Sequence, residues 1–138
     1  MDNNVITSKL SSLARCVGRI RLKSPQSVEA LIDDYDLQDI ISLNLERSIH
    51  NCVDIAAHIL SEQDIPVPET MAESFDKLYE LGFVPVDLAL RLKKAVGFRN
   101  LAVHTYQAID WNIVFSIITE RLDDFPEFAR CIIERMEI

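Results

Sequence analysis

Residues 36–59 read DLQDIISLNLERSIHNCVDIAAHI, and this stretch decides the fold class. Apolar side chains recur along it at steps of three or four residues: Leu37, Ile41, Leu45, Ile49, Cys52, Ala56 and Ile59. That period is typical of one buried face of an α-helix. Asp36 is the predicted N-cap, with the acidic Asp39 at the capping-box position. We expect the helix to end near Gln63, because the segment Pro66-Val67-Pro68 cannot continue it.

The same period continues on both sides of this stretch. Upstream, the apolar residues predict a first helix over about residues 4–22, a loop over 23–27 and a short turn over 28–32. Towards the C-terminus, Asp110 is the predicted cap of a last helix. Pro126 must kink that helix or split it into two, because proline cannot sit undisturbed in a helix interior.

Two further helices are predicted between these segments. Thr70 and Glu73 form a capping box for one of them, and Gly82 suits the left-handed residue that closes a helix. Pro85 and Asp87 open the next helix. The chain shows no strand pattern of useful length and no internal repeat. The sequence therefore predicts an all-α, antiparallel bundle of four to five helices.

The composition supports one folded domain over residues 1–138. Hydrophobic residues make up 49% of the chain, which is enough to form a core. The N-terminal residues show no signal-peptide pattern, and no apolar run approaches the length that crosses a membrane. The three cysteines have no zinc spacing and are expected to be reduced thiols, which favours a cytoplasmic protein: Cys16, Cys52 and Cys131.

The net charge of −8 argues against a nonspecific binder of nucleic acid, and no DNA partner is expected. The charge is unevenly spread, however. Basic residues cluster over residues 9–23 and 91–99, whereas residues 29–39 contain acids and no base. One interpretation is a basic cleft on an acidic body. The other is that both basic clusters are ordinary solvated helix faces.

Residues 99–106 read RNLAVHTY and carry the chemistry of the chain. Arg99 is a permanent planar cation that suits phosphate, and His104 can exchange a proton near neutral pH. Together they could cleave RNA without a metal: one His104 would deprotonate the 2′-hydroxyl and another would protonate the leaving 5′-oxygen. Arg99 would neutralise charge on the phosphate, and Asn100 would hold His104 or the phosphate. The alternative is an ordinary helix end, with Arg99 paired to a neighbouring acid.

The helical period separates the two key side chains. A helix turns by about 100° per residue, so Arg99 and His104 point about 140° apart. Three arrangements could bring them together: the long arginine side chain reaches around, the helix unwinds locally, or a second subunit completes the site. Two copies around a two-fold axis would also gather basic residues into one cleft.

The motif resembles a known family. Residues Arg99 to His104 match the R-x4-6-H signature of the HEPN superfamily, with the polar Asn100 expected after the arginine. The extension to Tyr106 matches the RX4HXY form of the HepT toxins. The resemblance covers most of the chain, because residues 37–59 look like the second helix of that family, and residues 74–83 look like its third.

The resemblance implies an all-α homodimer whose active site lies at the dimer cleft. Arg99 and His104 would be the ribonuclease residues. Tyr106 would be the tyrosine that a cognate minimal nucleotidyltransferase antitoxin modifies with AMP. Such a modification would place a phosphate and a bulky base beside Arg99, block RNA and cancel the cation.

A weaker pattern lies on the long helix. His50, Asp54 and His58 share one face, one turn after Glu46. Histidines at such spacing can bind zinc or nickel, but a polar face beside an apolar stripe is usually solvated or structural. No metal and no cofactor are therefore expected. Asp54 and His58 are instead candidates to line the cleft, because their helix is expected to pack near the motif.

Trp111 and Phe115 lie at packing spacing and are expected in the core rather than on a platform that stacks bases. The main alternative to a ribonuclease is a noncatalytic helical subunit that presents substrate to a nucleotidyltransferase. The acidic net charge favours such a protein partner over RNA.

Overall fold

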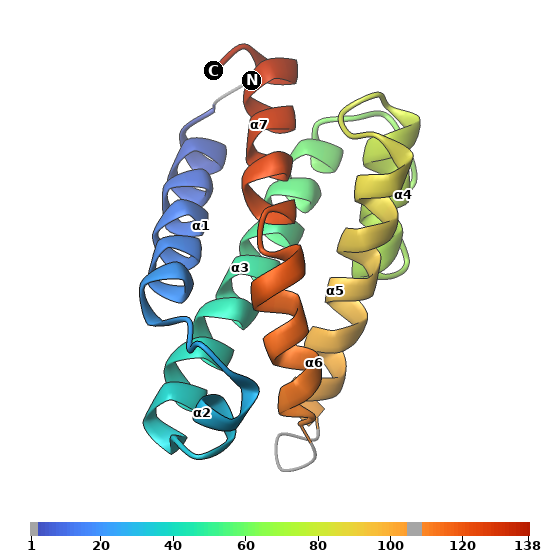
Figure 1. The fold of residues 1–138 in the computed structure, drawn as a ribbon. Coiled ribbons are helices and arrows are strands. Elements are labelled where there is room, and N and C mark those ends of the chain that lie inside the picture. Colours follow the sequence, from blue (N-terminus) through green and yellow to red (C-terminus); the bar gives the residue numbers. More distant parts are fainter. Residues whose placement is uncertain (1–2, 105–108) are drawn as a thin grey trace.

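The computed structural model describes residues 3–104 and 109–138, and all regular elements within these ranges are helical (Figure 1). In chain order they are α1 (Asn4–Lys23), α2 (Val28–Ile32), α3 (Tyr35–Ser61), α4 (Met71–Glu80), α5 (Val86–His104), α6 (Trp111–Ser116), the π-helical turn η2 (Ile117–Arg121) and α7 (Asp124–Met136). The predicted all-α bundle is confirmed. The predicted short turn is α2, and the last predicted helix is divided into α6, η2 and α7.

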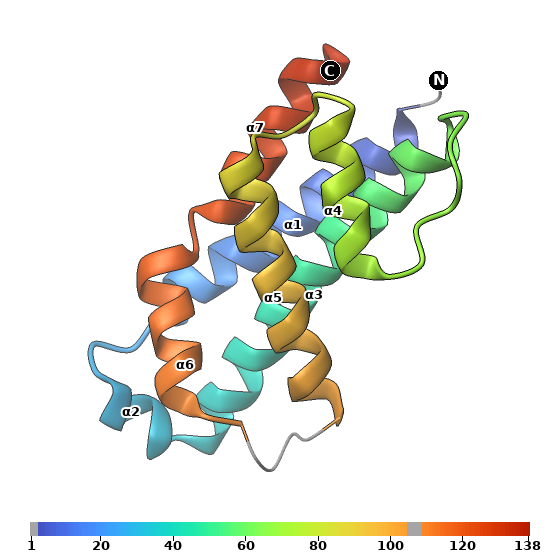
Figure 2. The ribbon, with the colours of Figure 1, turned by 90° about the vertical axis from the view of Figure 1, so that its right-hand side faces the viewer.

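The long helix α3 runs through the bundle and contacts α1, α4, α5 and α7. Helices α1 and α3 are antiparallel: the Lys9 ammonium donates to Asp54 at 2.9 Å, and the Asn51 amide donates to Ser12 at 3.1 Å. Helices α4 and α5 form a second antiparallel pair on the other side of α3 (Figure 2). The described start of α1 and the end of α7 lie at the same end of the bundle, away from the C-terminal end of α5 (Figure 1).

The start of α3 corrects one expectation. Asp34, not Asp36, is the N-cap: its backbone is extended and its carboxylate accepts a hydrogen bond from the Leu37 amide at 3.0 Å. Asp36 lies in the first turn, where its charge still favours the positive end of the helix dipole. Asp34 can take the N-cap position because α2 already ends at Ile32, so that α3 begins earlier than predicted, at Tyr35. The helix ends at Ser61, two residues before the predicted position.

The α4–α5 turn follows the predicted chemistry closely. The Thr70 hydroxyl accepts from the Glu73 amide at 3.1 Å, which confirms the capping interaction. At the other end of α4, Gly82 has a φ of 83° and its amide donates to the Tyr79 carbonyl. The Phe83 amide donates to the Leu78 carbonyl, so the two bonds form a Schellman motif. This tight ending turns the chain directly into α5.

Pro126 splits the last helix, as predicted. It lies in the first turn of α7, where a missing amide proton removes no helical hydrogen bond. The preceding residues form the π-helical turn η2, an element that the sequence pattern did not indicate. Asp110 caps α6 by accepting from the Asn112 amide at 2.9 Å.

The core is built from the predicted apolar stripes, with aromatic contacts between helices. The rings of Phe75 in α4 and Phe128 in α7 meet edge to face, with their centroids 6.0 Å apart. Two apolar residues near helix starts are exposed rather than buried: Met71 by 39% and Ile113 by 49%. Trp111 and Phe115 are partly buried against the core, in line with their expected packing role.

The three cysteines form no disulfide; two of them, Cys16 and Cys52, are buried, and Cys131 is partly buried. Burial raises the pKa of the Cys52 thiol far above its ordinary value. Within the described ranges, none of the helices combines the length and the apolarity that a membrane span requires.

Candidate active site

Helix α5 carries the motif, and its N-terminal half is fixed by ion pairs to two neighbouring helices. Arg91 contacts three carboxylates, those of Asp87 at 3.3 Å, Asp124 at 2.8 Å and Glu127 at 3.2 Å. The hydrogen bond to Asp124 raises the pKa of Arg91, and the bond from Arg91 lowers the pKa of Asp87. Lys93 reaches Asp76 on α4 at 3.1 Å. These contacts tie α5 to α4 and α7, so the position of the motif is determined by the bundle.

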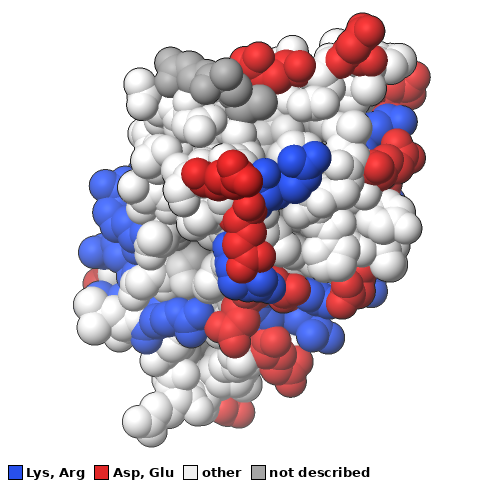
Figure 3. All heavy atoms as spheres, turned by 90° about the horizontal axis from the view of Figure 1, so that it is seen from above, with Lys and Arg blue, Asp and Glu red and all other residues white. Residues whose placement is uncertain are grey.

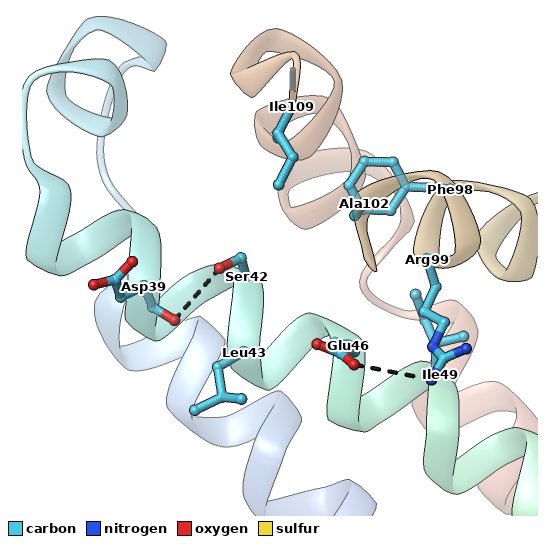
Figure 4. Close-up of a pocket in the computed structure, with 9 residues that line it drawn as sticks. All are labelled: Asp39, Ser42, Leu43, Glu46, Ile49, Phe98, Arg99, Ala102 and Ile109. Carbon is cyan, nitrogen blue, oxygen red and sulfur yellow. Dashed lines mark hydrogen bonds and ion pairs between the residues drawn. The ribbon is translucent and has the colours of Figure 1, made fainter. Parts of the chain in front are cut away.

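One cavity lies where the C-terminal half of α5 crosses the N-terminal half of α3. Its volume is about 430 Å³ (Figure 4). Helix α3 contributes mostly polar and acidic side chains, among them Asp39, Ser42 and Glu46. Helix α5 contributes Phe98 and Arg99. The cavity therefore has an arginine on one wall and carboxylates on the other.

Arg99 is the predicted catalytic residue that the structure places in this cavity. Its side chain is 18% exposed, and its Nε atom is buried with no hydrogen-bond partner in the part of the chain that the structure describes. Its Nη2 atom lies 3.9 Å from the Glu46 carboxylate, at the outer limit of an ion pair. Its Nη1 atom donates to the amide oxygen of Asn100 at 3.3 Å and approaches the sulfur of Met71 at 4.0 Å. A partly buried guanidinium with incomplete hydrogen bonding can still bind an anion.

Asn100 thus contacts Arg99, whereas the sequence suggested that it would hold His104 or the phosphate. Its side chain is exposed beside the arginine. The amide oxygen accepts from the guanidinium, and the amide group also carries N–H donors that suit a phosphate.

His104 is the last residue of α5, and its side chain lies outside the described part of the structure. Tyr106 also lies outside the described residues. The backbone is helical from Arg99 to His104, so the helix does not unwind between them. Two of the three predicted arrangements are left: an arginine that reaches around its own helix, or a site completed by a second copy.

The structure places Asp54 and His58 away from the Arg99 cavity, whose lining does not include them. Asp54 pairs with Lys9 at 2.9 Å and with His50 at 3.4 Å, so it joins α3 to α1. The Nε2 atom of His58 is buried and has no hydrogen-bond partner among the described residues. No group of three or more metal-ligand side chains occurs within the described ranges.

Sequence reasoning missed two neighbours of Arg99. Glu46 had been considered only as part of a metal-ligand stripe, and Phe98 not at all. Figure 4 shows the Glu46 carboxylate facing the guanidinium and the Phe98 ring on the adjoining wall. Glu46 is separated from Arg99 by 53 positions, and no local pattern connects two such distant residues.

An all-α bundle with an Arg–x4–His motif at the end of one helix defines a HEPN-type protein. A family model described as ribonuclease HepT-like matches residues 13–132. The chain belongs to this family.

Individual relatives agree with this assignment. The chain is 36% identical over 126 residues to the mRNA nuclease HepT of Shewanella oneidensis, a match that covers 91% of this chain and 94% of that protein. It is 27% identical over 126 residues to the tRNA nuclease HepT of Aphanizomenon flos-aquae, covering 91% and 86% of the two chains.

A solved structure shows the same fold. It is that of the tri-AMPylated Shewanella oneidensis HEPN toxin in complex with MNT antitoxin. The match has a TM-score of 0.87 at 35% identity and covers 95% of this chain and 98% of that one.

Proposed function

We propose that this chain is a toxin of the HepT type, an RNA endonuclease that cuts without a metal. The observation that carries the proposal is Arg99, a largely buried guanidinium at the wall of a cavity. Among the described residues its Nε has no hydrogen-bond partner, and its one carboxylate partner is that of Glu46 at 3.9 Å. A structural arginine at this level of burial would have close acidic partners, as Arg91 has. The names of the relatives, which are mRNA and tRNA nucleases, support RNA as the substrate.

The reaction follows from the residue types. His104 of one protomer takes the proton of a 2′-hydroxyl, and the oxygen attacks the adjacent phosphorus. The P–O5′ bond breaks, and a second, protonated His104 gives its proton to the leaving oxygen. Arg99 stabilises the additional negative charge on the phosphate oxygens. The products are a 2′,3′-cyclic phosphate and a 5′-hydroxyl, and no metal is needed to balance the step.

A homodimer provides the two histidines. The backbone is helical from Arg99 to His104, and positions five residues apart on a helix lie about 140° apart around its axis, which supports a site completed by a second protomer. Leu43, which lines the cavity, is 45% exposed, and Leu101 on α5 is 63% exposed. A second copy that covers these leucines would bring its own motif to the same cavity.

The partner that silences the toxin is a minimal nucleotidyltransferase antitoxin. The solved neighbour is an AMPylated HEPN toxin bound to its antitoxin, which supports the same regulation here. Tyr106 follows the motif by two residues and is the proposed acceptor of AMP. The added phosphate would compete with RNA for Arg99. RNA and the nucleotide donor are both cytoplasmic, and we place the protein there.

The test is cleavage of RNA by the purified chain in the presence of a chelator. We expect cleavage to persist in EDTA, to yield cyclic-phosphate ends and to disappear in His104→Ala. His50→Ala, a histidine outside the site, is the matched control and should cleave normally. Strict dependence on added Mg²⁺ would overturn the metal-independent mechanism.

A second experiment separates the toxin from the noncatalytic subunit that the acidic charge suggests. Expression should arrest growth, and arrest should be lost in Arg99→Ala. Co-expression with the antitoxin should add AMP mass units that are lost in Tyr106→Phe. Growth arrest that survives Arg99→Ala and His104→Ala would show that this site does not carry the toxicity.

A further inference from the structure

A second pocket lies next to the Arg99 cavity, between α5 on one side and α6 and η2 on the other. Its volume is about 270 Å³. Its walls are mainly apolar and include Ala95 and Phe98 from α5 and Ile113 and Ile117 from the opposite side. Phe98 lines both this pocket and the Arg99 cavity, so the two spaces adjoin each other.

The rim of this pocket carries two cations for which the described residues provide no ion pair. Lys94 and Arg121 line it, and neither has an acidic partner among the described residues. Arg91 also lines it, but Arg91 is already neutralised by Asp124, the one acid among the described lining residues. The free charge at the rim is therefore positive, although the whole chain carries a net charge of −8.

One wall of the pocket is built by the rare element of this fold. Ile117 and Arg121 are the first and last residues of the π-helical turn η2. A π-turn is less favourable than a continuous α-helix, and such turns frequently lie at functional sites. Here the turn directs an apolar side chain and a cation to the same pocket.

We propose that this pocket is a subsite for one nucleobase of the RNA, next to the nucleotide that is cut. The base lies between the apolar walls, against Phe98, and the phosphate of the same nucleotide contacts Lys94 and Arg121. Apolar and aromatic walls accept every base face, and cations at the edge of such a pocket follow the backbone. The inference rests on the proposed ribonuclease function, because adjacency to Arg99 places the base beside the reacting phosphate.

The pocket also explains how an acidic protein can bind RNA. The net negative charge of the chain repels a polyanion. At the end of the bundle where the two termini lie, acidic and basic side chains are interspersed (Figure 3). Affinity must then come from local contacts. Stacking on an apolar wall is independent of net charge, and two unpaired cations act over a short distance.

The first experiment changes the substrate: it removes a nucleobase and leaves the protein unaltered. The substrate is an oligonucleotide with a single ribonucleotide in a deoxynucleotide background and an abasic site on either side of it. One of the two neighbouring nucleotides places its base in the pocket, and an abasic site at that position should lower kcat/KM about tenfold. The abasic site on the other side should have less than about twofold effect. In Ala95→Phe, which fills the pocket, the difference between the two substrates should vanish.

The second experiment removes the cations. Lys94→Ala combined with Arg121→Ala should raise KM about tenfold and lower the salt dependence of cleavage. Arg15→Ala combined with Arg19→Ala removes the same charge from an exposed face of α1 and should change KM less than about twofold. Equal effects of the two pairs would overturn the subsite, because they would show that only the total charge matters.

Two further measurements separate a failure of the subsite from misfolding of a variant and from a failure of the proposed function. Ile117→Phe fills the same pocket from η2 and provides a second variant if Ala95→Phe lowers the thermal midpoint. If the native chain cleaves no RNA, the proposed function fails and the pocket is tested by binding. ¹H–¹⁵N spectra with AMP, CMP, GMP or UMP should then shift the amides of Lys94, Ala95 and Ile117, whereas inorganic phosphate should not shift Ile117.

Two results would overturn the subsite outright. One is an absence of those shifts together with equal loss at both abasic positions. The other is a filled-pocket variant that cleaves RNA normally but no longer binds the antitoxin, which would make the pocket a protein-docking site.

Discussion

The two halves of α5 contain similar residues and use them differently. In the N-terminal half, Arg91 is held by three carboxylates, the nearest at 2.8 Å. In the C-terminal half, Arg99 is at least as buried, yet the nearest carboxylate among the described residues lies 3.9 Å away. The first arrangement fixes a helix, because its charges are satisfied. The second leaves binding capacity, because a buried cation with incomplete partners gains from an incoming phosphate.

The strongest test of this contrast is Arg99→Ala. We expect RNA cleavage to fall by about 10²–10³-fold, since the variant loses the cation that stabilises the transition state. The free energy of unfolding should change little, because the ion pair of Arg99 with Glu46 is long, at 3.9 Å. Initial rates of cleavage and urea unfolding of the same preparations measure both quantities. A large loss of stability would show that Arg99 is structural like Arg91.

The converse variant is Arg91→Ala. It leaves Asp124, whose side chain is 15% exposed, without its main partner. We expect unfolding to become easier by about 1–3 kcal/mol, between the values for surface and buried pairs. Arg130→Ala on α7 is the matched control, because its pair with Glu134 is exposed and should be worth less than about 0.5 kcal/mol. Urea denaturation with a constant m-value makes the comparison.

A smaller effect is expected from Glu46→Gln. The substitution removes the carboxylate that faces Arg99 while keeping the size of the side chain. The KM for RNA should fall by about two- to fourfold, because the phosphate no longer competes with an exposed, weak ion pair. An increase in KM would mean that Glu46 positions the arginine instead. Steady-state kinetics at two salt concentrations distinguish the two results.

The smallest expected effect is the loss of stability at acid pH that comes from the Asp87–Arg91 pair. Arg91 lowers the pKa of Asp87, so the folded state favours the ionised carboxylate. Stability from this pair is therefore present above the ordinary aspartate pKa and is lost as the pH falls through the lowered value. Asp87 is exposed, and only a slight difference between the native chain and Asp87→Asn is expected. Amide exchange in the first turns of α5, followed from neutral to acid pH, should detect it.

Much of this fold could be predicted because its signals are local. The apolar period along α3, the Thr70 cap and the Gly82 ending each depend on residues within a few positions of one another. The cap at Asp34 was misplaced to Asp36 because residues 33–36 contain three aspartates that are equally good caps, and only the end of α2 selects one.

The site was harder to predict because its contacts are distant in sequence. The motif identified Arg99, but the approach of Glu46 and Phe98 depends on how α3 crosses α5. The π-turn has no sequence signature, since the same residues suit an ordinary helix. Both features arise from packing between helices, which periodicity does not encode.

The cysteine arrangement has a practical consequence. Cys16 and Cys52 are buried, so only Cys131 on α7 is partly accessible to a thiol reagent. Burial raises the pKa of the Cys131 thiol as well, and its labelling should be slow but selective. A nitroxide or fluorophore attached there would occupy one position per protomer. The distance between two such labels would then measure how two protomers are arranged in solution, without altering a residue of the proposed site.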